Sequence, residues 1–476
     1  MTRYTAALLG LVAVCCDALP MRSPLTPVRR SPATGPLTVS RRNPRYFTDD
    51  PRTGRAVYLT GTETWAVLQD QGPGDPPPAF DWEGYLDTLV TLNHNYIRLY
   101  SWEQADWTAE TKGEYRFAPL PFLRTGPGLA LDGKPKFDLT RFDPAYFDRL
   151  RARIQEAGRK GIYVGIMLFD GWSIEDKDFG ADTPWKGHPF NRANNVNGID
   201  GDPHFHDDGK ETHTLEIPAV TRIQEAYVRH VIDAVNDLDN VLYEISNESH
   251  PHADQWQYHM IRFIQAYEAT LPKQHPVGMS AEYPDGSNAS LFASPADFIS
   301  PDDSGGYSSA HPPAADGRKV ILLDDDHLCC HEPDWVWRSF LQGMNPLFMD
   351  QWGATGNMIG ASQQDARDPQ WPLLRRYLGY TLTYANRIPL ERMTPHGELS
   401  TSGFCLADPD DPHPQYLVFL PDERSVTVNV SAARGPLTVE WFSPGENEVL
   451  IADPVQGGSP RLLRAPFGGS VVLYLH

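Results

Sequence analysis

Short apolar runs that alternate with helical patterns constrain this chain more than any other feature of its sequence. Eight such runs, rich in β-branched and aromatic residues, cover residues 56–61, 96–100, 162–169, 241–246, 276–280, 297–300, 320–323 and 346–349. Apolar residues at helical spacing occupy several of the intervals, at 82–92, 144–157, 218–238, 253–270 and 335–341. This alternation predicts an α/β fold, a (β/α)8 TIM barrel with long insertions on its loops. The connection between the fifth and sixth runs is too short for a full helix.

The pattern changes beyond residue 395. Alternating runs at 416–420, 426–430, 437–442 and 470–475 are separated by Gly, Pro, Asp and Ser turn signals, which is typical of a small antiparallel β-sandwich. A chain of 476 residues also exceeds the size at which one hydrophobic core stops growing. We therefore expect a catalytic barrel over residues 43–394 and an accessory β-sandwich domain over residues 395–476.

The N-terminal segment is a separate piece. Arg3 precedes an apolar run at 6–16 that is too short to span a membrane. We expect a signal peptide over residues 1–18, followed by a linker rich in Pro, Ser and Arg over residues 19–42. The protein is then secreted to the cell exterior or the periplasm. Two alternatives stay open: a buried N-terminal helix, and a cytosolic protein that starts at Met21.

The net charge limits the partners that the chain can bind. Lys and Arg number 41 against 62 Asp and Glu, which gives a net charge of −21. Such a surface repels a phosphate backbone, so we expect no nucleic acid as partner. We expect no membrane span and a monomer. Outside the expected signal peptide, Cys329, Cys330 and Cys405 are odd in number and lack metal-type spacing, so at most one disulfide is expected.

Polar residues follow several predicted strands at the end where barrel enzymes hold their active sites. Asn247 and Glu248 follow the fourth strand, and Asp324, Asp325 and Asp326 follow the seventh. Glycosidic cleavage requires two carboxyl groups facing one cavity, one to protonate the leaving oxygen and one to act as nucleophile or base. Since side chains alternate along a strand, Asp324 and Asp326 share one face. The expected catalytic pair is Glu248 with either Asp326 or Asp324.

Other residues near these strand ends are expected to contact the substrate. A Trp follows each of the first, second, third and eighth strands, and flat rings stack on the faces of sugars. Packing within a loop is the alternative for each single Trp, and His327 either binds substrate or supports Asp350. The expected substrate contacts are Arg98, Asn247, Trp65, Trp102, Glu103, Asp170, Trp172, His188, His327, Asp350 and Trp352.

The Asn-Glu pair after strand four, the acidic residue after strand seven and the Arg on strand two resemble the clan of (β/α)8 retaining glycoside hydrolases that includes the cellulase-like families. The chain more closely resembles the secreted cellulase-like proteins related to apiosidases. The similar segments are 43–47, 58–61 with 64–65, 92–95 with 97–98, and 335–348. These proteins often end in a small sandwich labelled as a collagen-binding domain, which segments 403–405, 416–421, 439–442 and 465–467 resemble.

The resemblance implies that Glu248 is the general acid/base, that Asn247 holds a sugar hydroxyl, and that Arg98 orients the strand-seven carboxylate. The clan has Glu on strand seven, whereas this chain offers only Asp. The apiosidase-like pattern of Asp, a small residue and an acid favours Asp326 as the reactive group and Asp324 as a positioning residue. Because Asp is one methylene shorter than Glu, the carboxyl separation widens toward that of inverting enzymes, and retention is the weaker part of the expectation.

We therefore expect a secreted glycoside hydrolase that cleaves O-glycosidic bonds in a polysaccharide or oligosaccharide. One alternative is a carbohydrate-binding or adhesion protein on a barrel that has lost catalysis. A metal hydrolase with ligands at residues 324–327 is disfavoured, because consecutive residues rarely all reach one ion. No paired-His helical motif is present either. We expect no cofactor and no metal.

Overall fold

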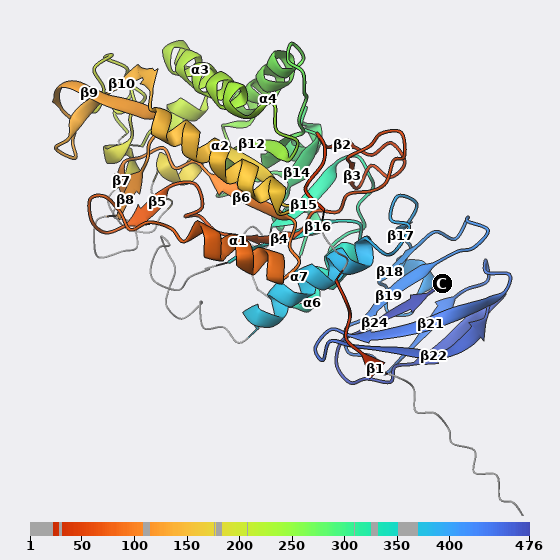
Figure 1. Ribbon diagram of the computed structural model, residues 1–476. Helices are drawn as coiled ribbons and strands as arrows, with labels where there is room; N and C mark the ends of the chain where they lie inside the picture. Colours follow the sequence, from red (N-terminus) through yellow and green to blue (C-terminus); the bar gives the residue numbers. More distant parts are fainter. Residues whose placement is uncertain are drawn as a thin grey trace, which may run out of the picture.

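The computed structural model describes residues 22–27, 31–107, 115–175, 177, 183–206, 208–308, 310–324, 332–350 and 370–476. At its centre lies an eight-stranded sheet in the order β4-β16-β15-β14-β13-β12-β11-β6 (Figure 1). The strands are β4 (Gly61–Glu63), β6 (Tyr96–Tyr100), β11 (Tyr163–Asp170), β12 (Val241–Asn247), β13 (Val277–Ser280), β14 (Phe298–Ser300), β15 (Val320–Asp324) and β16 (Asn345–Met349). Neighbours in this order pair in parallel. The N–H of Asn95 donates to Thr60 O at 3.0 Å and brings β4 and β6 together. The fold is the predicted (β/α)8 barrel.

The barrel strands follow the predicted runs closely, with one displacement. Seven of the eight agree with the prediction to within one residue at each end. The first strand is formed by Gly61–Glu63 instead of residues 56–61. The residues before Gly61 have other partners, since Val57 bridges Phe47 and the N–H of Leu59 donates to the Asn345 side chain at 3.0 Å.

Helices connect the strands and cover the outside of the barrel (Figure 1). They are α1 (Trp82–Thr91), α2 (Pro144–Arg159), α3 (Pro218–Val235), α4 (Asp254–Glu268), α5 (Asn288–Ala293), α6 (Asp334–Leu341) and α7 (Trp371–Ala385). The start of α2 is typical: Pro144 occupies the first turn, and Asp143 accepts a hydrogen bond from the N–H of Ala145. The six residues of α5 agree with the short connection expected after the fifth strand. Helix α7 was not predicted.

Part of the segment expected to be a linker covers the N-terminal end of the barrel. Strand β2 (Thr38–Val39) pairs antiparallel with β3 (Phe47–Thr48). Leu37 and Phe47 join a buried apolar cluster with residues at or near the starts of several barrel strands, among them Tyr96 and Phe298. Because this end is filled with apolar side chains, the polar groups at the opposite end of the strands form the candidate site.

The C-terminal region forms a seven-stranded sheet in the order β1-β22-β21-β24-β19-β18-β17, covered by the pair β20-β23. The strands are β1 (Arg22–Ser23), β17 (Thr394–Pro395), β18 (Cys405–Ala407), β19 (Tyr416–Leu420), β20 (Ser425–Asn429), β21 (Pro436–Ser443), β22 (Glu448–Gln456), β23 (Pro460–Arg464) and β24 (Val471–Leu475). The pairings are antiparallel. This is the small antiparallel β-domain expected from the alternating runs. Its edge strand β1 comes from the segment expected to be a linker.

The barrel and the C-terminal sheet share an apolar contact through α6 and α7, seen beside the blue sheet in Figure 1. Trp337 on α6 stacks on Phe419, with centroids 6.2 Å apart. The Tyr384 hydroxyl donates to the Glu440 carboxylate at 2.8 Å. Arg387 donates to both oxygens of the same carboxylate, at 3.0 and 2.7 Å. The two parts are therefore packed as one body.

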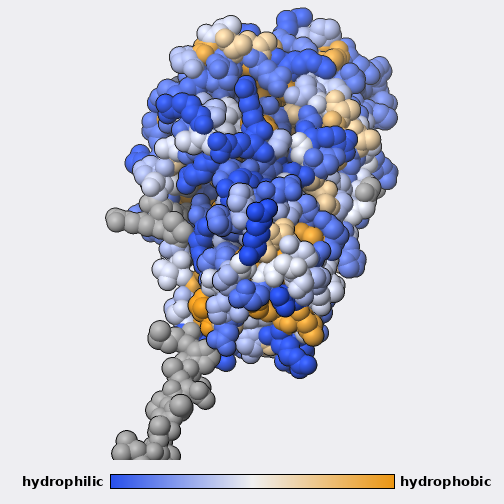
Figure 2. Space-filling model, turned by 90° about the vertical axis from the view of Figure 1, so that its right-hand side faces the viewer, coloured by the Kyte–Doolittle hydropathy of each residue, from blue (hydrophilic) through white to orange (hydrophobic). Residues whose placement is uncertain are grey.

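Insertions gather beyond the first three barrel strands. Strands β5 (Asp70–Gly72), β8 (Tyr115–Ala118) and β7 (Asp106–Trp107) form one small sheet, and β9 (Phe122–Leu129) pairs with β10 (Pro135–Phe142). Three short 3-10 helices follow β11: η1 (Gly171–Ser173), η2 (Pro184–Gly187) and η3 (Lys210–His213). The face drawn in Figure 2 is mostly hydrophilic, in keeping with the net charge of −21. None of the helices in the described ranges is long and apolar enough to cross a membrane.

Candidate active site

A buried ionic cluster fills the barrel interior around Arg98, which lies in the middle of β6. Nε and Nη2 of Arg98 donate to the two carboxylate oxygens of Glu244 on β12, at 2.9 and 3.0 Å. Nη1 donates to Glu63 Oε1 on β4 at 3.0 Å and to Asp324 on β15. All four side chains are buried. Arg98 therefore ties four barrel strands together and holds a strand-seven carboxylate.

The cluster places three carboxyl groups around one guanidinium. Burial raises the pKa of Glu63 well above its ordinary value, and the nearby charge of Asp324 adds to this rise against the opposing effect of Arg98. These surroundings favour the protonated form of Glu63, which reduces the repulsion within the cluster. Asp324 faces Arg98 in the interior and is not exposed to solvent.

Glu248 directly follows β12 in an unusual backbone conformation. Its φ is +41°, in the left-handed region that residues other than glycine seldom adopt. Its Oε2 accepts a hydrogen bond from Nε1 of Trp172, and its carbonyl oxygen accepts one from Nζ of Lys177. Gly171 lies against the same carbonyl, where a Cβ would be 2.1 Å from the oxygen. These three neighbours fix the turn that carries the Glu248 carboxyl at the C-terminal end of the barrel.

Two histidines converge on Glu103, which follows β6. His188 Nε2 lies 3.3 Å from one carboxylate oxygen and His213 Nε2 lies 3.2 Å from the other. The N–H of Phe190 donates to His188 Nδ1 at 3.0 Å, so a neutral His188 carries its proton on Nε2, facing Glu103. Burial alone would raise the pKa of Glu103, but the hydrogen bonds from His188 and His213 outweigh it and lower the pKa to about 2. Glu103 is therefore an ionised acceptor that positions two rings.

Asp170 ends β11 and is fully buried. Its Oδ1 accepts a hydrogen bond from the N–H of Trp172 at 2.9 Å, while its Oδ2 has no hydrogen-bond partner among the described residues. Burial raises the pKa of Asp170 well above its ordinary value, and the charges of Glu248 and Glu103 raise it further. These effects favour the protonated form of Asp170, in which its carboxyl can donate a hydrogen bond beside Glu248.

A pair of aromatic rings lies beside Glu248. The rings of Trp172 and Tyr283 are nearly parallel, with centroids 6.1 Å apart and an angle of 14°. Tyr283 is 42% exposed, and the buried Lys177 ammonium lies 5.8 and 5.5 Å from the two centroids. The exposed part of Tyr283 therefore offers an aromatic surface of the kind on which sugar rings stack.

The other two described Trp residues of the expected set pack against each other. Trp102 is only 2% exposed, and its Nε1 donates to the carbonyl oxygen of Trp65 at 3.1 Å. Their rings meet edge to face with centroids 6.2 Å apart. Trp102 therefore packs within the loops instead of presenting its ring to solvent, which corrects its expected role. Its burial against Phe117, with centroids 5.3 Å apart, explains the difference.

The remaining expected residues have different surroundings. Asp350 is buried and accepts hydrogen bonds at both carboxylate oxygens from Arg375 on α7, at 2.7 Å from Nε and also from Nη2. It thus holds α7 to the end of β16, and a sugar contact at Asp350 is not what the structure shows. Asn247 is buried, and its Oδ1 lacks a partner in the described part of the chain. Asp325, Asp326, His327 and Trp352 lie outside the described residues.

Sequence reasoning missed several residues of this site. Glu282 and Tyr283 follow the fifth strand, so the same positional argument that selected Glu248 would have found them. Burial, followed by the charge of Asp254, raises the pKa of Glu282 to about 8. Lys177 and His213 come from the long segment after β11, and no local sequence signal shows that it folds back onto the strand ends.

Comparisons with known proteins agree with this architecture. A family model described as a domain of unknown function (DUF6298) matches residues 86–289. A search of curated proteins finds none that matches the chain.

Among solved structures, a glycoside hydrolase family 5 protein from Bacteroides vulgatus ATCC 8482 is similar, with a TM-score of 0.58 and 14% identity, covering 94% of this chain and 95% of that one. A candidate glycoside hydrolase from the same bacterium has a TM-score of 0.60 and 15% identity over 93% of this chain and 82% of its own. A third structure, described as a glycoside hydrolase, has a TM-score of 0.55 and 13% identity over 94% and 98% of the two chains. At these identities the likeness establishes the fold shared with glycoside hydrolases.

Proposed function

We propose that the protein is a glycoside hydrolase that cleaves O-glycosidic bonds in a polysaccharide or oligosaccharide. Glu248 acts as the general acid/base, and a strand-seven aspartate is its partner. In a retaining reaction, the aspartate forms the glycosyl-enzyme while Glu248 protonates the leaving oxygen, after which Glu248 activates a water. A single proton donor thus serves both steps.

The main support for this proposal is the position of the Glu248 carboxyl and the residues around it. It lies at the C-terminal end of a barrel strand, as active-site residues of this fold do, and it is hydrogen-bonded to the indole of Trp172. The same indole stacks with the exposed Tyr283. A sugar ring seated on this pair would have its glycosidic oxygen near the proton donor.

The partner carboxylate is proposed to be Asp326, with Asp324 as the alternative. Asp324 is buried and held by Arg98, which supports a positioning role and leaves the reactive role to Asp326. We propose further that Asn247 holds a sugar hydroxyl, since its buried Oδ1 has no partner in the described part of the chain. Asp170 and His188 are proposed as further substrate contacts, with His188 held by Glu103.

The finer parts of the proposal rest on sequence. The Arg3 and apolar pattern of residues 1–18 supports export. The resemblance to apiosidase-related proteins supports a plant, algal or microbial glycan as substrate and a ligand-binding role for the C-terminal sheet.

Turnover on a panel of glycans tests the proposal. Glu248→Gln and Asp326→Asn should each lose at least about 100-fold in kcat, whereas Glu225→Gln, on α3 and paired with His259, should leave turnover unchanged. An aryl glycoside with a good leaving group should restore much of the Glu248→Gln activity but not that of Asp326→Asn, because such a group needs little protonation. The anomer first released, followed by NMR, distinguishes retention from inversion. Near-normal turnover by either variant would refute its assignment.

The alternative, a carbohydrate-binding protein on a barrel without catalysis, is favoured by one observation. The one strand-seven carboxylate within the described residues, Asp324, is wholly engaged with the interior of the barrel. Calorimetric binding of an oligosaccharide with no product after long incubation would support this alternative. Any hydrolysis abolished by Glu248→Gln would exclude it.

A further inference from the structure

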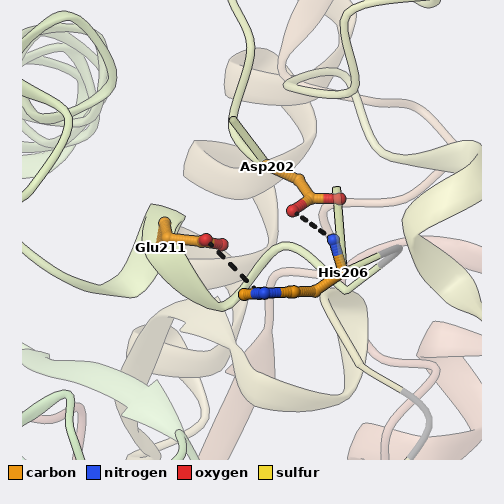
Figure 3. A group of neighbouring side chains, drawn as sticks. All are labelled: Asp202, His206 and Glu211. Atoms are coloured by element: carbon orange, nitrogen blue, oxygen red, sulfur yellow. Dashed lines mark hydrogen bonds and ion pairs between the residues drawn. The ribbon is translucent and has the colours of Figure 1, made fainter. Parts of the chain in front are cut away.

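A second polar cluster lies in the segment between η2 and α3, apart from Glu248. Among the described residues, Asp202, His206 and Glu211 are the group of His, Cys, Asp and Glu side chains whose ligand atoms lie within 4.8 Å of one another. Figure 3 shows the carboxylates of Asp202 and Glu211 on either side of His206. His204 contacts the same Glu211, with Nδ1 2.9 Å from Oε1. Three ligand atoms therefore lie close together, and His204 borders them through its contact with Glu211.

The spacing of these atoms suits a small cation. His206 Nδ1 lies 3.7 Å from Glu211 Oε1, and the N–H of His206 donates to Asp202 Oδ1 at 2.9 Å, which fixes that carboxylate beside the loop. Around a tetrahedral ion with bonds of about 2.0–2.2 Å, neighbouring ligand atoms are about 3.4 Å apart. His204 and His206 are exposed, so their side chains can turn toward the two carboxylates.

Glu211 supplies an independent sign of a ligand. The residue is only 8% exposed, and its Oε2 has no hydrogen-bond partner among the described residues. A buried carboxylate oxygen without a partner is unfavourable and is usually satisfied by a donor or a cation.

The loop itself is held in a shape that presents both histidines. Phe205 has a φ of +61° and is 81% exposed, so no burial of its ring accounts for this strained backbone. The rings of His204 and His206 lie on the same side of the loop, stacked with centroids 5.9 Å apart. The strained residue thus brings its two neighbours toward Glu211.

We propose that this cluster binds one Zn²⁺ ion through His204, His206, Asp202 and Glu211. Imidazole nitrogens with carboxylate oxygens suit Zn²⁺, whereas Ca²⁺ and Mg²⁺ prefer sites made of oxygen alone. Four protein ligands leave no open position, so the ion is structural.

Helix η3 gives the site a consequence for the barrel. Its four residues carry both Glu211 and His213, and His213 lies 3.2 Å from Glu103 and 3.1 Å from Ser249 Oγ. A bound Zn²⁺ would fasten the segment that delivers His213 to the strand ends. This inference does not depend on the proposed glycosidase activity.

Titration of untagged full-length protein, first treated with a chelator, with ZnCl2 tests the site. Calorimetry should show one equivalent per chain with micromolar or tighter affinity, and a thermal scan should show a higher Tm with Zn²⁺. His206→Ala and Glu211→Gln should each weaken binding at least about 100-fold. MgCl2 and CaCl2 should not raise the Tm. His259→Ala, which removes a partly exposed histidine paired with Glu225, should bind as wild type does.

A second readout guards against loss of folding in the variants. His206 is exposed, so His206→Ala should keep the wild-type circular dichroism spectrum. CoCl2 in place of ZnCl2 should produce a visible absorption band with wild type and His259→Ala but not with His206→Ala. No saturable binding at 1 mM ZnCl2, or equal binding by wild type, His206→Ala and Glu211→Gln, would overturn the proposal.

Discussion

Gly171 lies directly against the carbonyl oxygen of Glu248, so close that a Cβ on residue 171 would be 2.1 Å from that oxygen. Gly171→Ala must therefore displace the turn that holds the proposed general acid. We expect a loss of stability of about 1–3 kcal/mol and a fall in kcat. Urea unfolding and turnover measure the two effects. Gly445→Ala is the matched control, since a Cβ there meets nothing within 4 Å. Equal behaviour of the two variants would contradict the close approach.

Replacing Arg98 should destabilise the barrel strongly. Arg98→Met leaves Glu244 and Asp324 buried without their cation, and breaking a buried ion pair costs about 3–5 kcal/mol. Glu63→Gln should cost much less, because the surroundings of Glu63 already favour its uncharged form. The free energy of unfolding in urea measures both, with the exposed Arg52→Met as control. If Arg98→Met lowered the free energy of unfolding less than Glu63→Gln does, Arg98 would not be the residue that holds the cluster together.

Glu103 should contribute stability that depends on acid pH. Its pKa is about 2 in the folded protein against an ordinary 4.5, so the folded state favours the ionised form. The contribution is complete above pH 4.5 and is lost as the pH falls through this range toward 2. Compared with wild type, Glu103→Gln should lose up to about 3 kcal/mol at pH 7 and progressively less as the pH falls below 4.5. A difference that stays constant from pH 7 to pH 3 would show that Glu103 is not shifted.

Glu282 should have the opposite effect. Its pKa of about 8 lies above the ordinary 4.5, so the folded state binds the proton more tightly. Stability should therefore fall as the pH rises from 4.5 to 8, by at most about 1.4 kcal/mol per pH unit. Glu282→Gln should remove this part of the slope, measured as Tm against pH. If Glu282→Gln left the slope of Tm against pH unchanged, a group other than Glu282 would be responsible for that slope.

The indole N–H of Trp172 should matter separately from its ring. Trp172→Phe keeps an aromatic face but loses the donor to Glu248, so we expect kcat to fall about 10-fold with little change in KM. Trp172→Ala should also raise KM. Trp82→Phe is the matched control. Trp82 lies on the outer helix α1, and its Nε1 donates to Glu156 on α2 at 2.9 Å, so this variant also loses one indole hydrogen bond to a carboxylate. If Trp172→Phe raises KM and leaves kcat unchanged, Trp172 acts through its ring in substrate binding and not through its N–H in catalysis.

The barrel could be predicted because each strand carries its own signal. The run at 96–100 and strand β6 coincide, because the four apolar and aromatic residues on either side of Arg98 favour a buried strand. Strand β22 was missed because its Asp453 and Pro454 break the apolar alternation, and only its pairing with β21 reveals it. Strand β1 is two residues long and depends wholly on a partner more than 400 positions away in the sequence.

The candidate site was predictable only where a residue directly follows a strand. This rule placed Glu248 and Asp170 at strand ends, where the structure has them, and their roles stay predictions. The ring of Trp102 satisfied the same rule but is buried by Phe117 from the next insertion, a contact that no local pattern encodes. His213 and Lys177 reach the strand ends through a long segment whose path depends on tertiary packing. Their positions were therefore beyond sequence reasoning.

The two residues of β1 also bear on how the protein should be produced. They pair with Val449 and Leu450 along the outer edge of β22, and Leu37 further along fills the N-terminal end of the barrel. A recombinant chain that began at residue 43 would leave the backbone N–H and C=O groups of β22 open to pairing with another molecule, a known route to aggregation. Residues 22–42 should therefore be retained in a recombinant protein, and a purification tag belongs at the other end of the chain.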